Sequence, residues 1–360
     1  MPLLDKTNIE KVEKYNNFVR KSEFASATQD INWSLVKKDW DNEQVFIEQD
    51  GKIVAAMSLL IKRVLGNYAM IYVPRGPVCD IYNKDLVNEL VLEVQPVAHK
   101  YNAFMLRFDP EVNYDKSLGE MYGELGFIVR NLGLSKDDFI QPRYNMVLDI
   151  ENLDEDGVLK KFSKKTRYNI GLASRKGVIV NYYNSDEALE IFYELHEIMG
   201  KRNKIAIRPL QYFKDMRVAF GQQLRIYITE HEGDYLSAAI AISYGKKVWY
   251  IYGASSNEKR NFMPNYIMQW EMIKWALEQG ATKYDFGGVF ELNHSDGLYK
   301  FKEGFCYTDG ATELIGEFDK VYKPLVYYSF TKLVPKVQKL RKSLNTVKCL
   351  GRGGKNEKDS

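Results

Sequence analysis

Short hydrophobic runs with strand-like composition alternate along the chain with longer segments of helical periodicity. In the first half, residues 44–50 and 52–64 are rich in β-branched and aliphatic residues and flank Asp50-Gly51, so they predict a β-hairpin. Leu and Val recur at near-helical spacing over residues 84–101, which predicts a helix. The half as a whole predicts the order hairpin, strand, helix, strand, over residues 44–64, 68–73, 84–101 and 103–108.

The same order of elements returns in the second half. A helix predicted from Pro264, a favourable first-turn residue, is closed by Gly280. The strand predicted after it ends at the pair Gly287-Gly288. Two such units, about 180 residues apart, indicate a duplicated domain and a mixed α/β (α+β) fold. The predicted elements of this half are strands over 224–230, 235–243, 247–252 and 283–286 and a helix over 264–279.

An acidic, polar segment at residues 152–157 predicts the boundary between the units. We therefore expect one domain over residues 1–150 and a second over 151–319. The chain from residue 320 predicts a terminal helix interrupted at Pro335, followed by a basic, disordered tail over 346–360. Further helices are expected over 156–162, 164–176 and 186–199.

The composition excludes several classes of protein. With 45% hydrophobic and 28% charged residues in 360, the chain fits neither a disordered polyelectrolyte nor a membrane bundle. Its first ten residues carry both charge signs and no apolar core, so we expect no signal peptide. Three widely spaced cysteines exclude a disulfide framework. A cytoplasmic protein is the expectation.

The formal charge of +3, from 51 Lys and Arg against 48 Asp and Glu, hides an uneven distribution of cations. One run of basic residues without an intervening acid favours a positive surface suited to phosphate backbones, although a merely basic exposed helix explains the charge equally well. A second basic cluster precedes Tyr212 and Phe213 and suits a diphosphate. The first run comprises Lys160, Lys161, Lys164, Lys165, Arg167, Arg175 and Lys176, and the second Lys201, Arg202, Lys204 and Arg208.

Candidate chemistry is restricted to carboxylates and lysines at turns. An acyl-CoA cradle needs a glycine-rich loop with free N–H groups, whereas residues 255–265 contain no glycine and include Pro264, which has no N–H. The four histidines are scattered and no cysteine lies in a nucleophile motif, so we expect no metal site and no thiol chemistry. The remaining candidates are Asp109, Asp285, Lys300 and Lys302.

Seven short motifs, in this order, resemble the Fem family of non-ribosomal peptidyl transferases. Those enzymes build the interpeptide bridges of peptidoglycan from aminoacyl-tRNA. The resemblance covers about residues 30–330, and it is the number and order of the motifs that make it specific. They are Trp33-Ser34-Leu35-Val36-Lys37, Phe108-Asp109-Pro110, Lys164-Lys165-Thr166-Arg167, Arg208-Pro209 with Tyr212, Tyr250-Ile251-Tyr252-Gly253-Ala254-Ser255, Tyr284-Asp285-Phe286-Gly287-Gly288 and Tyr299-Lys300-Phe301-Lys302-Glu303-Gly304-Phe305.

This resemblance implies two tandem acetyltransferase-like (GNAT-like) domains, the first binding a peptidoglycan precursor and the second aminoacyl-tRNA. The C-terminal helix, over residues 320–345, would return to complete the first domain. Some members carry a long coiled-coil arm in the second domain, but residues 186–224 leave no room for one. The chain is therefore similar to the compact FemX-like branch.

The resemblance also implies an aminolysis without cofactor or metal. An amine on the stem peptide of UDP-MurNAc-pentapeptide or of lipid II would attack the ester of aminoacyl-tRNA. By the same resemblance, Lys37, Arg208, Tyr212 and Tyr252 would bind the precursor, and Asp109 would orient or deprotonate the amine. Phe301 would stack on the terminal adenosine, and Lys302 would stabilise the developing charge. We assign Lys164, Lys165 and Arg167 to the tRNA backbone as a hypothesis.

Simpler interpretations stay open for these residues and for the whole chain. Lys37 fits an exposed helix lysine, Asp109 a turn former, the tyrosines core residues, Phe301 a residue of a strand core, and Lys302 a solvated side chain. The alternative functions are an N-acyltransferase using acyl-CoA or acyl carrier protein and a non-catalytic RNA-binding or envelope protein of the same fold. We expect a monomer, with a basic C-terminus that either contacts an anionic membrane leaflet or is simply solvated.

Overall fold

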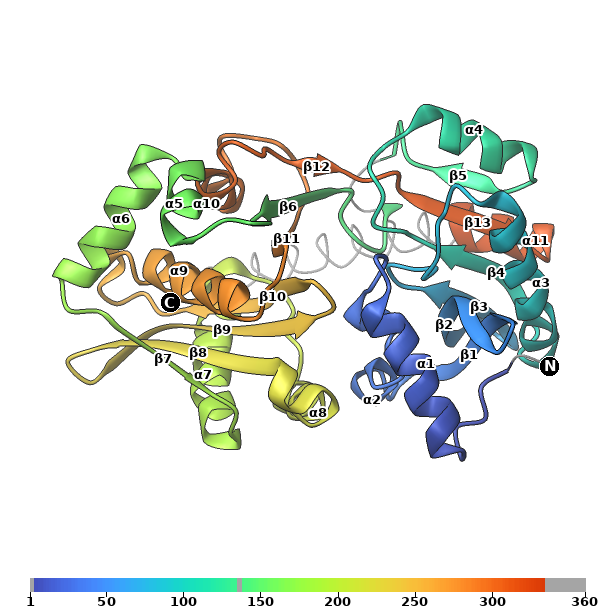
Figure 1. Ribbon diagram of the computed structural model, residues 1–360, viewed down its shortest axis with the longest axis horizontal. Coiled ribbons are helices and arrows are strands. Elements are labelled where there is room, and N and C mark those ends of the chain that lie inside the picture. The colour runs from blue at the N-terminus through green and yellow to red at the C-terminus, as the bar shows by residue number, and fades with distance from the viewer. Residues whose placement is uncertain (1–2, 135–137, 334–360) are drawn as a thin grey trace, which may run out of the picture.

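The computed structural model describes residues 3–134 and 138–333, which form two units that lie side by side, each built on one mixed sheet (Figure 1). The first sheet has six strands in the order β1-β2-β3-β4-β13-β5. The predicted hairpin is β1 and β2, and β3 and β4 form the parallel pair of this sheet. The strands are β1 Asp41–Gln49, β2 Lys52–Leu65, β3 Tyr68–Val73, β4 Ala103–Phe108, β5 Ile128–Arg130 and β13 Glu317–Val321.

The second sheet has seven strands in the order β12-β6-β11-β10-β9-β8-β7. Its hairpin of β8 and β9 leads to β10, which pairs in parallel with β11, so the predicted duplication of element order is confirmed. These strands are β6 Tyr144–Asp149, β7 Ile179–Tyr183, β8 Leu224–His231, β9 Asp234–Tyr244, β10 Lys247–Ser255, β11 Lys283–Val289 and β12 Thr312–Glu313.

Helices cover both sheets, and the longer ones begin where the sequence places capping residues. Asn83 caps the crossover helix α3 through its side chain, and Pro264 stands in the first turn of α9, the crossover helix of the second unit. None of the described helices is long and apolar enough to cross a membrane. The helices are α1 Ile9–Lys21, α2 Trp33–Val36, α3 Lys84–Lys100, α4 Lys116–Glu124, α5 Glu155–Lys161, α6 Lys164–Arg175, α7 Asp186–Asn203, α8 Leu210–Phe220, α9 Pro264–Glu278, α10 Gly297–Phe305 and α11 Pro324–Tyr328.

The chain changes sheets earlier than the predicted boundaries at residues 150 and 319. Strand β6 belongs to the second sheet, because it pairs with β11 and buries Met146 and Leu148 in the core of that unit. Strand β13 belongs to the first sheet, where Phe318 stacks on Phe108 at 5.2 Å. Each unit therefore takes a strand from beyond its expected boundary.

The described start of the C-terminal segment packs on the first unit, as the resemblance implied. Val326, Tyr327 and Phe330 contact the face of the first sheet that carries Phe104, with the rings of Phe104 and Phe330 5.3 Å apart. A short π-helix, Ser329–Leu333, follows α11. The rest of the predicted terminal helix and the basic tail lie outside the described residues.

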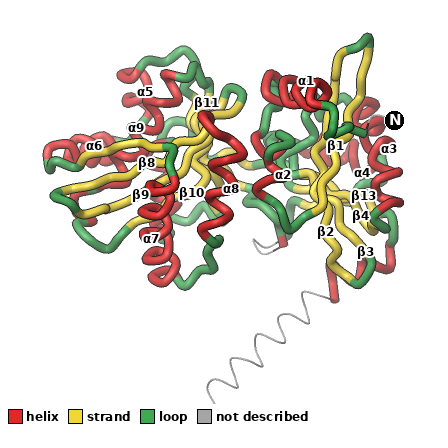
Figure 2. The backbone as a smooth tube through the Cα atoms, turned by 90° about the horizontal axis from the view of Figure 1, so that it is seen from below, coloured by secondary structure: helices red, strands yellow, loops and turns green. Residues whose placement is uncertain are grey.

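A third core joins the two units. It contains Trp33 of α2 together with Phe213 and Phe220 of α8, and the ring of Trp33 lies 6.0 Å from that of Phe220. Figure 2 shows α2 and α8 between the two sheets. The interface between the units is thus a hydrophobic core, which holds the elements on either side in one arrangement.

Candidate active site

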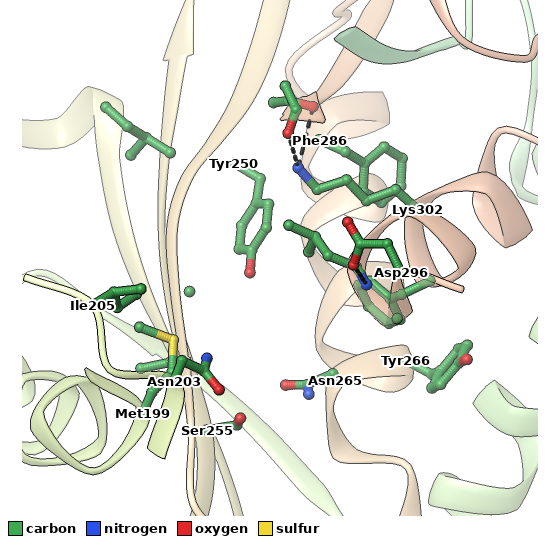
Figure 3. Close-up of a pocket in the computed structure, with 18 of the residues that line it drawn as sticks. Met199, Asn203, Ile205, Tyr250, Ser255, Asn265, Tyr266, Phe286, Asp296 and Lys302 are labelled. Carbon is green, nitrogen blue, oxygen red and sulfur yellow. Dashed lines mark hydrogen bonds between the residues drawn. The ribbon is translucent and has the colours of Figure 1, made fainter. Parts of the chain in front are cut away.

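A cavity of about 970 Å³ opens in the second unit where β10 and β11 diverge. The two strands pair only from Lys247 to Trp249 on β10 and from Lys283 to Asp285 on β11. Beyond these residues the strands are no longer hydrogen-bonded to each other, and the cavity lies between them. Residues of α7, α9 and α10 line it (Figure 3). Arg75 and Gln141, from the first half of the chain, complete the lining. The cavity therefore draws its walls from both units.

Lys302 lies in the wall of this cavity and is not the solvated lysine of the simpler interpretation. Its side chain is only 5% exposed, and Nζ donates to the carbonyl oxygens of Gly287, at 3.2 Å, and Gly288, at 2.9 Å (Figure 3). Burial lowers the pKa of Lys302 to about 8, and the nearby Asp285 carboxylate opposes part of that fall. The ammonium group is thus held by two neutral carbonyls and keeps its charge at neutral pH.

Phe301 lines the same cavity from α10, so it belongs to a helix and not to a strand core. Its ring is half-buried and packs edge-on against Tyr266 and Phe305, at 5.0 and 5.3 Å between centroids. An aromatic ring and a buried ammonium group that line the same cavity suit the base and the ester of a nucleotide-linked acyl donor.

Asp109 directly follows β4, is 2% exposed, and is hydrogen-bonded to Arg75 and Gln141 of the cavity wall. Its carboxylate accepts hydrogen bonds from the Tyr72 hydroxyl at 2.8 Å, the Arg75 backbone N–H at 2.7 Å and the Gln141 amide at 3.1 Å. Burial raises the pKa of Asp109 to about 6, against the lowering effect of Arg75. The Arg75 N–H belongs to a turn 34 residues away, so this bond leaves untested the interpretation of Asp109 as a turn former before Pro110, while its pKa of about 6 suits Asp109 to proton transfer near neutrality.

The four residues expected to bind the precursor meet at the junction of α2 and α8. The Tyr212 hydroxyl accepts from Lys37 Nζ at 3.2 Å and from the Tyr252 hydroxyl at 3.3 Å. The Arg208 guanidinium lies 5.4 Å from the centre of the Tyr212 ring. Burial, reinforced by repulsion from Arg208, lowers the pKa of Lys37 to about 8. Within residues 3–134 and 138–333 no carboxylate is bonded to Lys37, so two cations and two hydroxyls form a site suited to a diphosphate.

Strand β10 connects the two sites. Tyr250 packs under α9 and lines the cavity, whereas Tyr252 packs against the core that joins the units. A β-bulge between these two residues shifts the register with β9. One short segment thus contributes to both sites.

The basic run divides into free and engaged side chains. Lys164 and Lys165 are exposed on α6, which packs against α9 and α10. Arg167 instead donates to the carbonyls of Leu159 and Phe162, at the end of α5. Lys161 forms an ion pair with Asp309 at 2.7 Å. Nothing in the geometry beyond exposure tests a role in tRNA binding, so the assignment of Lys164, Lys165 and Arg167 stays a prediction.

Three residues at or beside the site are not predicted by the sequence analysis, and only the first of them has a signal in the sequence. Arg75 lines the cavity at a positive φ of 52°, within Pro74-Arg75-Gly76-Pro77, a turn whose conformation its residue types suggest. Gln141 and Lys247 stand in no recognisable motif.

Among residues 3–134 and 138–333 no group of three His, Cys, Asp or Glu side chains could hold a metal ion.

Comparison with known proteins places the chain in a family. The model of the FemAB family matches residues 10–234 and 228–334. The chain belongs to the FemAB family. A UDP-N-acetylmuramoylpentapeptide-lysine N(6)-alanyltransferase of Weissella viridescens is 38% identical over 338 residues, which cover 92% of this chain and 100% of the relative. A lipid II:glycine glycyltransferase of Staphylococcus aureus strain MRSA252 is 30% identical, with 91% and 96% covered.

Solved structures agree with the predicted fold. The crystal structure of FemX superposes with a TM-score of 0.83 at 27% identity, covering 92% of this chain and all of that one. A tandem GNAT protein of the clavulanic acid pathway gives 0.53 at 11% identity, over 89% and 97% of the two chains, which shows the fold alone. This FemAB chain has the expected compact form, because α7 and α8 are the only helices between residues 186 and 220, all of which the structure describes.

Proposed function

We propose that this FemAB protein transfers an amino acid from aminoacyl-tRNA to the side-chain amine of the stem peptide of a peptidoglycan precursor. The observation that carries the proposal is the buried ammonium group of Lys302, beside Phe301, in a cavity whose far wall is built by the unit that carries Asp109. The relatives from Weissella viridescens and Staphylococcus aureus are both named as transferases that add amino acids to such precursors, which supports the proposal.

The precursor would bind at the junction of the units. Its diphosphate would meet Lys37 and Arg208, with the hydroxyls of Tyr212 and Tyr252 as further donors. UDP-MurNAc-pentapeptide and lipid II share this diphosphate, so either fits the proposal. From here the stem peptide would extend toward Asp109 and the cavity.

The tRNA would approach from the side of α6 and α10. Lys164 and Lys165 are exposed there for contact with the phosphate backbone, and the 3′-terminal adenosine would stack on Phe301. The acyl ester would then lie beside Lys302.

The reaction would be a simple aminolysis. The neutral amine attacks the ester carbonyl, an N–C bond forms, and the tetrahedral intermediate carries its negative charge near Lys302. The C–O bond to the ribose then breaks, the 3′-oxygen takes a proton, and the amine loses one, directly or by way of Asp109. The protein's main contribution is to hold two large substrates in reacting positions.

Single-turnover transfer from a panel of charged tRNAs to each of the two acceptors tests this function, with radiolabelled acetyl-CoA as the competing donor. We expect transfer from tRNA and none from acetyl-CoA. Lys302→Ala should lower the rate about 100-fold or more, because it removes the charge-stabilising donor. Lys300→Ala, an exposed lysine on the same helix, is the matched control and should keep the rate. Acetyl transfer, or a Lys302→Ala enzyme as fast as wild type, would overturn the proposal.

A further inference from the structure

A row of charged side chains, some of them buried, crosses from one unit to the other beside the cavity. Lys247, at the start of β10, has a side chain only 17% exposed. Its Nζ lies 2.6 Å from the Glu111 carboxylate, which follows β4 in the first unit, and 3.4 Å from the Asp285 carboxylate on β11. Burial alone would lower the pKa of Lys247, but the two carboxylates outweigh it and raise that pKa. Lys247 is therefore a charged bridge between the units.

On the second unit the bridge leads to Lys302. The Asp285 side chain is 2% exposed and accepts from the Gly287 N–H at 2.7 Å and from the Asn145 amide at 3.0 Å. Gly287 has a positive φ of 76°, so this bond helps fix a turn that few residues could form. The carbonyls of that turn hold Lys302 Nζ. The position of Lys302 thus depends on a turn that Asp285 shapes.

On the first unit the bridge leads to Asp109. Glu111 lies 3.8 Å from the guanidinium of Arg75, whose backbone N–H donates to Asp109 at 2.7 Å. The Arg75 side chain is itself 9% exposed and also donates to the Pro142 carbonyl. The two candidate catalytic residues are therefore the ends of one continuous polar network with Lys247 at its centre.

We propose that Lys247 is a positioning residue, which fixes the acceptor side of the active site, at Asp109, relative to the donor side, at Lys302. The inference rests on the proposed function, because it assigns Lys247 to the geometry of that reaction. Two reactants delivered by different units react fast only if the units keep one separation, and a misplacement of about 1 Å can cost 100-fold in rate. The shared hydrophobic core holds the units together, while Lys247 aligns the groups at the reacting end.

Removal of Lys247 would also alter the charge felt by Lys302. The charged or titratable groups around Lys302 are Asp285 on β11, Cys306 after its own helix and Asp296 at the N-cap of that helix. Lys247 neutralises the first of these. Without it, Asp285 would attract the proton of Lys302 more strongly, and the pKa of Lys302 would rise. A role in folding alone would not produce this change.

The test compares Lys247→Met with wild type in single-turnover transfer across pH. We expect a rate lowered about 10-fold to 100-fold with little change in acceptor KM, and a break in the pH profile displaced to higher pH. Lys247→Arg should recover part of the rate because it keeps the charge, and Glu111→Gln should lower it, since it cuts the bridge on the first unit without removing the lysine.

Lys38→Met is the matched control, because Lys38 pairs with Asp215 of α8 at 2.7 Å, also between the units, but at an exposed position. It should leave rate and pH profile unchanged. Melting temperatures of all variants separate loss of fold from loss of alignment. A folded Lys247→Met enzyme with wild-type rate and profile would overturn the inference, as would an equal loss in Lys38→Met. If wild-type protein transfers nothing, it is the proposed function that fails.

Discussion

Lys302 and Lys37 are both held at a pKa near 8, and the pH dependence of transfer should separate their roles. The lowering from 10.5 means that the charged form of Lys302 costs about 3 kcal/mol more in the protein than in water. At pH 7 about nine-tenths of the molecules still carry the ammonium group, and at pH 9 only about one-tenth do. If transfer requires the charged form of Lys302, the pH dependence of the rate must change between pH 7 and pH 9.

The sign follows from the two protons involved. The attacking amine must be neutral, and with an ordinary pKa of about 10.4 its reactive fraction rises tenfold per pH unit below that value. Lys302 must be protonated, and its active fraction falls tenfold per unit above about 8. The logarithm of kcat should therefore rise up to about pH 8 and then level off.

The assay is single-turnover transfer at saturating acceptor from pH 6.5 to 9.5, within the lifetime of the ester. In Lys302→Met the rate should be lower throughout, but it should continue to rise through pH 8 because the opposing titration is gone. Lys37 should affect only kcat/KM, since a bound diphosphate holds its proton. A levelling near pH 8 that persists in Lys302→Met would refute the assignment of charge stabilisation to Lys302.

Three further changes test other parts of the site. In Gly253→Ala the new Cβ would stand 1.7 Å from the Tyr250 hydroxyl, so the ring must leave its place in the cavity; we expect loss of transfer and about 1–3 kcal/mol of stability, measured by denaturant unfolding. Tyr212→Phe removes the hydroxyl that accepts from the neighbouring lysine, and should raise acceptor KM about 5-fold to 10-fold at unchanged kcat. Lys164→Glu combined with Lys165→Glu should weaken tRNA binding and lower, by more than one, the number of ions released on binding, which is obtained from the slope of log affinity against log salt concentration. The measurement is filter binding at several salt concentrations. If affinity and slope both stay at their wild-type values, these two residues do not contact the tRNA.

Local sequence signals were sufficient for most of the repeated elements. Asp50-Gly51 and Glu232-Gly233 stand at the two hairpin turns, with Asp50, Gly51, Glu232 and Gly233 all at positive φ. Pro264 and Gly280 bound the crossover helix of the second unit within two residues. Such turns and caps depend on neighbouring residues only, which is why a sequence reveals them.

Pairing between distant segments was less accessible. Strand β6 pairs in the second sheet and β13 in the first. The alternation of hydrophobic and polar residues predicts a strand, but it does not show with which other strand that strand pairs. The helix α10 resembled a strand at Phe301, since a stretch of nine residues with three aromatic rings fits either period. The sequence around Lys247 did not indicate a role for it, because its two carboxylate partners, Glu111 and Asp285, are remote from it in the sequence.

The core around Trp33, shared by α2 and α8, has a thermodynamic consequence for the duplicated architecture. A buried cluster common to both halves makes their free energies of unfolding inseparable, so that calorimetry should record a single cooperative transition rather than two. Either half on its own would present this apolar face to water and would tend to aggregate. The protein thus has two copies of one topology but folds as a single unit. Replacing one half would require matching changes in the other half, because both contribute to the shared core.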